Sequence, residues 1–307
     1  MDQLVIRGDS VIILDDFSTG RHENISHFVG NPQISIIEGS ILDFPLMENL
    51  VGACDRVFHL AAAVGVFNIV RHPLESLTTN IKGSENVFEA CLKHNKPVLI
   101  TSSSEVYGKN TSDRLHENSD RVVGAPQKIR WSYSDAKAID ESIAISLHDF
   151  KGLETRIVRL FNTVGPRQTG EYGMVLPRFV ESALQNRVIT IYGSGNQTRC
   201  FGHVKDIVDA ILRVDKNRTA IGQPINVGVS DEISILDLAK RVIKISGSQS
   251  VIEFRTPSEI YGMRFEDMER RVPDTSLLGT LTGWKPTKTI DDIIMDIIGD
   301  LSKNSLS

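Results

Sequence analysis

Residues 99–108, LITSSSEVYG, join an apolar run to a serine cluster that closes on a glutamate. The apolar run occupies residues 97–100 and predicts a buried strand that leads directly into the serines. Further along, residues 132–137, SYSDAK, place Tyr133 and Lys137 four positions apart, so that on a helix both share one face. The two motifs together predict a strand and a helix that carry hydroxyl, carboxylate, phenol and ammonium groups.

Further apolar runs predict the remaining strands of the first half, at residues 11–14, 34–37, 56–60 and 155–161. Apolar residues at helical spacing predict helices between them, at residues 74–94 and 133–150. Strands that alternate with helical segments indicate an α/β protein with a doubly wound parallel sheet.

The pattern changes after Pro166, where glycine-rich loops separate shorter elements. Residues 176–186, 204–214 and 234–246 are predicted as helices, and residues 224–227 as a strand. We interpret this half as a smaller lobe that is interleaved with the first.

The composition is that of an ordinary globular protein of 307 residues with 40% hydrophobic residues. A net charge of −5 argues against nucleic acid or an acidic membrane surface as a partner. Cys54, Cys91 and Cys200 are far apart and have no zinc-like spacing, so they predict free thiols in a reducing compartment and no metal site. The sequence shows neither a signal peptide nor an apolar run of membrane-spanning length, and we expect a cytoplasmic protein.

The first strand poses a separate question, because residues 11–14 end in Asp15. In a dinucleotide-binding fold, a carboxylate that binds the ribose follows the first glycine of a Gly-rich turn by about 20 residues. Counting back from Asp15 passes the start of the sequence, and residues 1–8 are interpreted as the end of the helix after that turn. We therefore expect the first strand and the GxxGxxG turn to be missing. Taken alone, Asp15 is also explained as a turn residue after a strand.

The motifs in their order resemble the extended short-chain dehydrogenase/reductase family, specifically its nucleotide-sugar epimerases, dehydratases and decarboxylases. The resemblance spans nearly the whole chain, and its departure is the absent GxxGxxG turn. The matching segments are LDDFSTG (14–20), HLAA (59–62), NIKG (80–83), SSSEVYG (102–108), YSDAK (133–137), RLFNTVGPRQ (159–168), YGSGNQTRCFGHVKD (192–206) and RRVPD (270–274).

The resemblance implies a Rossmann-like doubly wound parallel sheet with a smaller, interleaved C-terminal substrate lobe. Residues 1–165 would form an NAD-binding domain truncated at its N-terminus. Residues 166–307 would form the nucleotide-sugar lobe, with residues 203–230 partly returning to the first domain. It also implies a homodimer, paired through helices near residues 82–95 and 133–150.

The resemblance also implies catalytic roles. Tyr133 would take a proton from a sugar hydroxyl, and Ser103 would hydrogen-bond the same hydroxyl. A nearby Lys137 ammonium is expected to lower the pKa of the phenol. Ser104 and Glu105 resemble the residues at these positions in UDP-glucuronate decarboxylases and GDP-mannose dehydratases, and also in many uncharacterised epimerases. Taken alone, Tyr133 and Lys137 are also explained as surface residues of a helix, and Glu105 as a carboxylate that caps a loop.

NAD is the cofactor that the resemblance implies, since Asp15 would accept the ribose hydroxyls and repel a 2′-phosphate. The residues expected to line the cofactor are Asp15, Asp16, Ser18, Thr19, Gly20, Ser40, Ile41, Leu60, Ala61, Ala62, Asn80, Thr101, Tyr133 and Lys137.

Five positions are expected to bind the substrate by the same resemblance: Ser103, Asn162, Tyr192, Arg199 and Arg271. Arg199 would hold the diphosphate, Asn162 the sugar or its phosphate, and Tyr192 the uracil. Arg271 would lie near a sugar carboxylate, although its planar fork also suits a diphosphate. A surface arginine, a turn residue and a core aromatic are the structural alternatives for Arg199, Asn162 and Tyr192.

Three hypotheses for function follow. The first is an NAD-dependent enzyme that oxidises C4 of a UDP-sugar transiently and acts as a 4-epimerase. The second is a UDP-glucuronate decarboxylase-like enzyme, favoured by Glu105 and Arg271. The third, from another class, is a truncated and inactive protein that still binds a nucleotide sugar.

Overall fold

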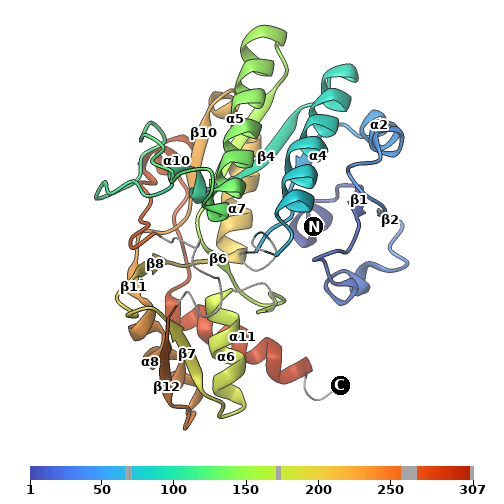
Figure 1. Cartoon of the computed structure of the whole chain (residues 1–307). Coiled ribbons are helices and arrows are strands. Elements are labelled where there is room, and N and C mark those ends of the chain that lie inside the picture. Colours follow the sequence, from blue (N-terminus) through green and yellow to red (C-terminus); the bar gives the residue numbers. More distant parts are fainter. Residues whose placement is uncertain (66–68, 70, 171–173, 257–267, 305–307) are drawn as a thin grey trace.

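A four-stranded parallel sheet forms the centre of the larger part of the molecule (Figure 1). The computed structural model describes residues 1–65, 69, 71–170, 174–256 and 268–304. The strand order is β10-β5-β4-β3. The strands are β3 (Val57–His59), β4 (Val98–Ser103), β5 (Thr155–Leu160) and β10 (Pro224–Val227). This confirms the predicted parallel α/β sheet.

Helices cover both faces of this sheet, because alternate side chains of a strand point to opposite faces. Val98 and Ile100 of β4 pack in a core with α2 (Phe44–Gly52), α4 (Pro73–Lys93) and α5 (Ser132–Lys151). Leu99, between them, packs in a second core with α7 (Val204–Lys216) and α10 (Ser276–Thr282). Each of the three strand residues is only 1% exposed.

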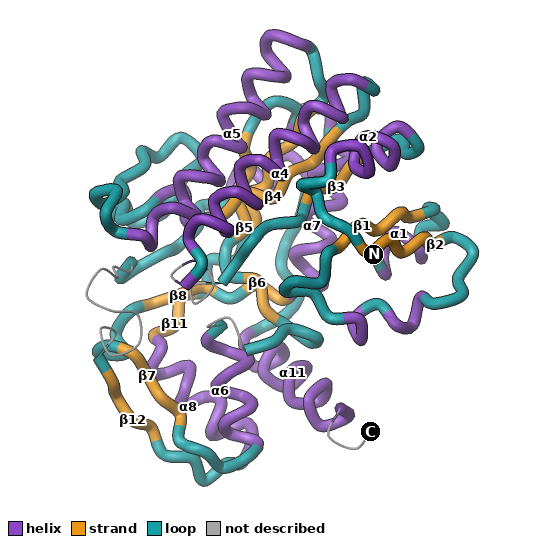
Figure 2. The backbone as a smooth tube through the Cα atoms, turned by 45° about the vertical axis from the view of Figure 1, so that its right-hand side comes forward, coloured by secondary structure: helices purple, strands orange, loops and turns teal. Residues whose placement is uncertain are grey.

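The two strands nearest the N-terminus form a sheet of their own. β1 (Val11–Asp15) pairs in parallel with β2 (Ile34–Glu38), and together they form a separate two-stranded sheet beside the short helix α1 (Asp2–Ile6) (Figure 2). The 3₁₀ turns η1 (His22–Asn24) and η2 (Ser26–Phe28) connect β1 to β2. Among the described residues, β1 pairs only with β2 and β3 pairs only with β4, so the parallel order is interrupted between β1 and β3.

The smaller part is built around a core of helices and short strands below the main sheet in Figure 1. Its helices are α6 (Val175–Leu184), α8 (Ile235–Ser246) and α11 (Ile290–Asn304). Strand β7 (Ile189–Tyr192) pairs in parallel with β12 (Ile252–Arg255). Between the two parts, β8 (Thr198–Cys200) pairs with β11 (Glu232–Ser234), and β6 (Thr163–Val164) pairs with β9 (Gly202–His203).

The chain returns to the main sheet after it has begun the smaller part, since α7 and β10 pack against β5. This arrangement agrees with an interleaved lobe, while the exact division at residues 165/166 stays a prediction. All three cysteines are free thiols, as predicted. In the described part of the chain, no helix has the length and apolar character needed to cross a membrane.

Candidate active site

Helix α5 carries Tyr133 and Lys137 one turn apart, near its N-terminus. The helix follows the 3₁₀ turn η4 (Ile129–Trp131) and ends at Gly152, which adopts a left-handed conformation with φ of 71°. Lys137 is buried and Tyr133 is half-buried. The helix therefore brings the phenol and the ammonium to the same region of the protein interior.

The carboxyl end of β4 supplies the hydroxyl groups. Ser103 ends the strand, and its Oγ accepts a hydrogen bond from the backbone N–H of Glu105 at 3.2 Å. That bond caps the 3₁₀ turn η3 (Ser104–Tyr107), which turns the chain so that Glu105 leaves the strand direction. Thr101 Oγ donates to the carbonyl of His59 at 3.2 Å and so joins β4 to the end of β3.

Glu105 lies between two arginines. Arg130, in η4, donates from Nη2 to Glu105 Oε1 at 2.8 Å, and its Nη1 lies 2.5 Å from Oε2. Arg271 Nη2 lies 2.9 Å from Glu105 Oε1, and its Nη1 donates to Ser104 Oγ at 3.2 Å. The side chains of Glu105, Arg130 and Arg271 are 13%, 4% and 6% exposed. We call these three residues the Glu105 cluster.

The electrostatics of the cluster follow from this geometry. Burial raises the pKa of Glu105, but Arg130 and Arg271 outweigh it and hold the pKa at about 2. Glu105 is therefore an ionised carboxylate at neutral pH. Because two guanidinium groups surround one carboxylate, the cluster carries one net positive charge. Arg130 was missed by sequence reasoning, and its position three residues before Tyr133 was the available signal.

The phenol of Tyr133 does not have the lowered pKa that its spacing from Lys137 predicted. Burial raises the pKa, the carboxylates of Glu105 and Asp140 raise it further, and Arg130 opposes them. The Lys137 ammonium lies 3.2 Å from Asp140 Oδ2, and this carboxylate neutralises it. The expectation that Lys137 lowers the pKa of Tyr133 is therefore wrong for this structure.

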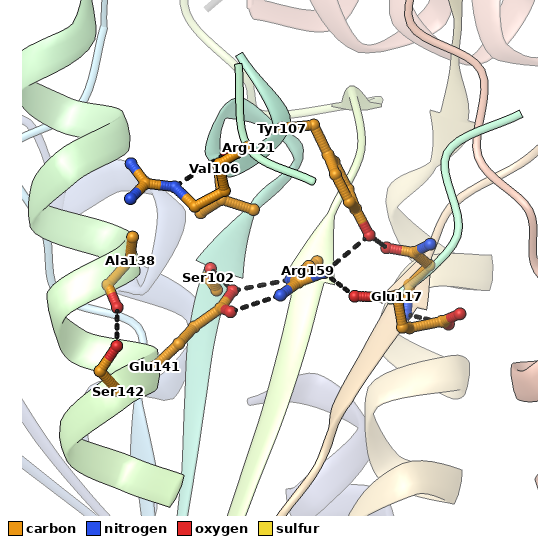
Figure 3. A network of polar contacts seen from close by, with 10 residues as sticks. Ser102, Val106, Tyr107, Glu117, Arg121, Ala138, Glu141, Ser142 and Arg159 are labelled. Atoms are coloured by element: carbon orange, nitrogen blue, oxygen red, sulfur yellow. Dashed lines mark hydrogen bonds and ion pairs between the residues drawn. The ribbon is translucent and has the colours of Figure 1, made fainter. Parts of the chain in front are cut away.

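A second buried polar network holds α5 on the sheet (Figure 3). The carboxylate of Glu141, one turn after Lys137, pairs with Arg159 of β5 at 2.7 Å. It also accepts a hydrogen bond from Ser102 Oγ of β4 at 2.5 Å. Arg159 in turn donates to Tyr107 Oη at 2.9 Å, and Tyr107 lies two residues after Glu105 in η3. This network, absent from the sequence-based site, connects the three elements that carry Tyr133, Ser103 and Glu105.

The first predicted cofactor residues lie at the end of β1, where Asp15 is the predicted ribose ligand, and in the tight loop that follows the strand. Asp15 Oδ1 accepts a hydrogen bond from the N–H of Phe17 at 2.9 Å, and Asp16 Oδ1 accepts one from Ser18 N–H at 3.0 Å. Thr19 completes the loop before Gly20. A Cβ at Gly20 would lie 3.0 Å from Asp15 Oδ1, so glycine leaves that carboxylate oxygen uncrowded.

The other predicted cofactor residues cluster near the ends of β2 and β3. Leu60 is 56% exposed and is followed by Ala61 and Ala62. Asn80 of α4 holds this loop against the helix, because its Oδ1 accepts a hydrogen bond from the N–H of Ala63 at 2.7 Å. Ser40 Oγ accepts a hydrogen bond from the Leu42 N–H at 3.2 Å.

Close packing explains the glycine in the NIKG motif. Ile41 is buried against Gly83 of α4, where a Cβ would come within 2.3 Å of Ile41 Cδ1. Any larger residue at position 83 would push the loop after β2 away from α4.

The predicted substrate residues are distributed over both parts of the molecule. Arg271 joins the Glu105 cluster. Asn162 donates to the carbonyl of Cys200 at 2.9 Å, and Arg199 is buried and donates to the carbonyl of Thr198 at 2.8 Å. The Tyr192 ring faces the Arg178 guanidinium at 4.6 Å. Of the five predicted substrate residues, Ser103 and Arg271 thus lie with the predicted catalytic residues, and the roles of all five stay predictions.

Known proteins that are similar to this chain belong to the family that the motifs resemble. The family model described as GDP-mannose 4,6 dehydratase matches residues 1–297. A UDP-N-acetyl-alpha-D-glucosaminuronate decarboxylase of Bacillus cytotoxicus is 39% identical over 93% of this chain and 88% of its own length. UDP-glucuronic acid decarboxylase 4 of Arabidopsis thaliana is 34% identical over 93% of this chain, which spans only 61% of that longer protein.

Among solved structures, UDP-glucuronic acid 4-epimerase from Bacillus cereus, in complex with UDP-glucuronic acid and NAD, superimposes with a TM-score of 0.88. It is 26% identical, and the match covers 99% of this chain and 94% of that one. These comparisons confirm both the resemblance and the fold class drawn from the motifs. The chain therefore belongs to the GDP-mannose 4,6-dehydratase family, a family of NAD-dependent enzymes that modify nucleotide sugars.

Proposed function

We propose that this protein is a UDP-uronate decarboxylase, which oxidises C4 of the sugar, releases the C5 carboxylate as CO2 and reduces C4 again. The observation that carries the proposal is the single net positive charge of the Glu105 cluster beside Tyr133. A substrate carboxylate would neutralise that charge, and the planar forks of Arg130 and Arg271 suit carboxylate recognition. The two decarboxylases to which this chain is similar support the choice of a uronate over a neutral sugar.

The residues present fit NAD at its two ends. Asp15 stands uncrowded beside Gly20 and suits the adenosine ribose, while the exposed Leu60 and the Tyr133–Lys137 pair suit the nicotinamide end. Bound NAD would supply a hydride acceptor and donor for C4. In this proposal Tyr133 Oη takes the proton of the C4 hydroxyl and later returns it, and Ser103 orients that hydroxyl.

The loss of CO2 follows from the oxidation state of C4. A ketone at C4 lies β to the carboxylate, so the C5–C6 bond can break with its electron pair moving into the ketone. A proton then reaches C5, and reduction of C4 completes a redox-neutral reaction. Arg130 and Arg271 would hold the carboxylate before the bond breaks, and Glu105 would keep both guanidinium groups in place.

The state of Glu105 argues against a 4,6-dehydratase reaction. That reaction needs a base to remove the C5 proton, and a carboxylate whose pKa is held at about 2 is a poor base. We therefore assign Glu105 a fixed electrostatic role instead of acid–base catalysis.

The second candidate is 4-epimerisation of the same UDP-uronate. The sequence alone favours 4-epimerisation of a UDP-sugar, without naming the sugar, over decarboxylation. It is supported by the similarity to the UDP-glucuronic acid 4-epimerase structure. The two reactions share C4 oxidation and part only at the ketone, which either loses CO2 or presents its other face to the hydride.

One experiment separates the candidates. The purified chain is incubated with NAD and either UDP-glucuronate or UDP-N-acetylglucosaminuronate, and the products are identified by proton NMR and mass spectrometry. A UDP-pentose with release of CO2 is expected. An isobaric 4-epimer would establish the second candidate, and an unchanged substrate with no bound NAD would support the non-catalytic nucleotide-sugar-binding alternative. Tyr133→Phe is the inactive control.

The exposed apolar residues of α5 support the proposal that two copies of the chain form a homodimer through this helix. Ile139 and Phe150 are 42% and 82% exposed on the helix surface, beside a groove lined by Ser142, Ser146 and Leu147. Apolar side chains gathered on one helix face are typical of protein interfaces.

A further inference from the structure

Helix α5 buries a carboxylate that the proposed chemistry does not use. Asp140 lies one turn after Lys137 and faces inward, and both side chains are 2% exposed. Lys137 Nζ donates to Asp140 Oδ2 at 3.2 Å. A pair of opposite charges this close, away from water, acts at a distance as a dipole and no longer as a free ammonium.

The polar groups around the Lys137–Asp140 pair are neutral or already have partners. From α4, the Ser84 hydroxyl faces Asp140 and also lies 2.9 Å from Nε2 of His59, at the end of β3. Burial and the charge of Lys137 lower the pKa of His59 to about 3, so this imidazole stays neutral. Glu141, the next residue of α5, is already engaged by Arg159. Asp140 is therefore the carboxylate that compensates Lys137.

The charges that face the Tyr133 phenol show the consequence. Glu105 from η3 and Asp140 from α5 both oppose ionisation of the phenol, and Arg130 from η4 favours it. Arg271 forms an ion pair with Glu105 and offsets part of its charge. Lys137, one turn away from Tyr133 on the same helix, is bound to Asp140. The Asp140 charge therefore disfavours ionisation of the phenol, and the Lys137 ammonium, paired with Asp140, stabilises the phenolate less than a free ammonium would.

We propose that Asp140 is a positioning residue that holds the Lys137 ammonium and thereby sets the pH at which Tyr133 can act as the base. The inference rests on the proposed role of Tyr133 as the group that accepts the C4 hydroxyl proton. When Asp140 loses its charge, the phenolate form of Tyr133 becomes easier to reach. The structure therefore assigns this chain a working pH above that of the same site with a neutral residue 140.

The test is the pH dependence of the Asp140→Asn variant, which keeps the shape of the side chain and removes its charge. The acid limb of kcat/KM is expected to move to lower pH by about one unit, which raises the rate about tenfold at a fixed pH on that limb. Asp140→Glu retains the charge and is expected to keep the wild-type midpoint.

A second readout requires neither cofactor nor substrate. The chain is labelled with ¹³C at tyrosine Cζ, and the Tyr133 resonance, assigned with Tyr133→Phe, is titrated in wild type and in Asp140→Asn. A lower titration midpoint in the variant supports the proposal even where turnover is absent, so failure of the proposed function is recognised separately. An unchanged or higher midpoint overturns it.

The matched control is Asp135→Asn, on the same helix but exposed and paired with Arg121 at 2.7 Å. Water and salt screen a charge at that position, so no change in the Tyr133 midpoint is expected. An equal shift in both variants would also overturn the proposal, because the effect would then belong to the net charge of α5 and not to Asp140.

Discussion

Arg159 and Glu141 form a bidentate ion pair that fastens α5 to the centre of the sheet, with Nε donating to Oε1 at 2.9 Å and Nη2 to Oε2 at 2.7 Å (Figure 3). Both side chains are at most 10% exposed. Since Glu141 shares α5 with Tyr133 and receives a hydrogen bond from Ser102, next to Ser103, the pair helps to fix the position of α5, with Tyr133, relative to the strand end that carries Ser103. In the proposed reaction, Tyr133 and Ser103 act on one sugar hydroxyl.

Removing one partner of this ion pair should destabilise the protein strongly. Glu141→Ala leaves the Arg159 charge buried without its carboxylate, and a loss of about 3 kcal/mol in the free energy of unfolding is expected. Urea unfolding followed by circular dichroism measures it. The control is Glu181→Ala, which breaks an exposed pair with Arg187 and should cost less than about 1 kcal/mol. Equal losses for both variants would contradict the role of the buried pair.

Tyr133 should be required for turnover but not for folding. Tyr133→Phe removes only the phenol hydroxyl, which in the proposed reaction exchanges a proton with the C4 hydroxyl of the sugar, and kcat is expected to fall by a factor of about 10² to 10⁴. Product formation by NMR measures the rate, and the unfolding midpoint should stay within the range of wild type. A variant that turns over at the wild-type rate would remove Tyr133 from the mechanism.

The sequence predicted those parts of the site that depend on local spacing. The period of a helix was enough to place Tyr133 and Lys137 on one face of α5, whereas the site role of Ser103 at the end of β4 came from the family resemblance. Arg130, Asp140 and Glu141 were missed because each owes its role to a partner that tertiary packing selects.

The pKa of Tyr133 and the pairing of the short strands also depend on tertiary contacts that the sequence does not reveal. Spacing placed Lys137 beside Tyr133, but only the folded chain shows that Asp140 neutralises the ammonium. In the smaller part, β7 and β12 have four residues each, and their pairing joins segments about 60 positions apart. Such strands gain their stability from the partner and leave little periodic signal in the sequence.

The ion pairs of Glu105 should make stability depend on acid pH. Its pKa in the folded protein is about 2, below the ordinary value of 4.5, so the carboxylate stabilises the fold above pH 4.5. That contribution, on the order of 3 kcal/mol, is lost as the pH falls from 4.5 toward 2. In urea unfolding at a series of pH values, the difference between wild type and Glu105→Gln should shrink across this window.

The control for this titration is Glu253→Gln, at an exposed pair with Arg255. Its stability curve should run parallel to that of wild type. A constant difference between wild type and Glu105→Gln down to pH 2 would show that Glu105 is not held as an ionised carboxylate.

Arg271 should discriminate between charged and neutral sugars. Arg271→Gln leaves Glu105 and Arg130 as a neutral pair, so the site loses its net positive charge. For UDP-glucuronate, kcat/KM is expected to fall about tenfold to a hundredfold, the range for a lost hydrogen bond to a charged group. Binding of UDP alone, measured by calorimetry, should change little. If UDP-glucose and UDP-glucuronate lose affinity equally, the arginine binds the diphosphate and not the carboxylate.

The outer face of α5 should pair two copies of the chain. Ile139 and Phe150 are exposed on this helix, and burying such side chains contributes about 1.5–3 kcal/mol each. Sedimentation equilibrium of the wild type should give twice the chain mass, and Ile139→Glu with Phe150→Glu should give the mass of one chain. Leu184→Glu, at a 37% exposed apolar residue of α6, is the control and should leave the dimer intact. A wild-type protein that sediments as a monomer at micromolar concentration would contradict the pairing.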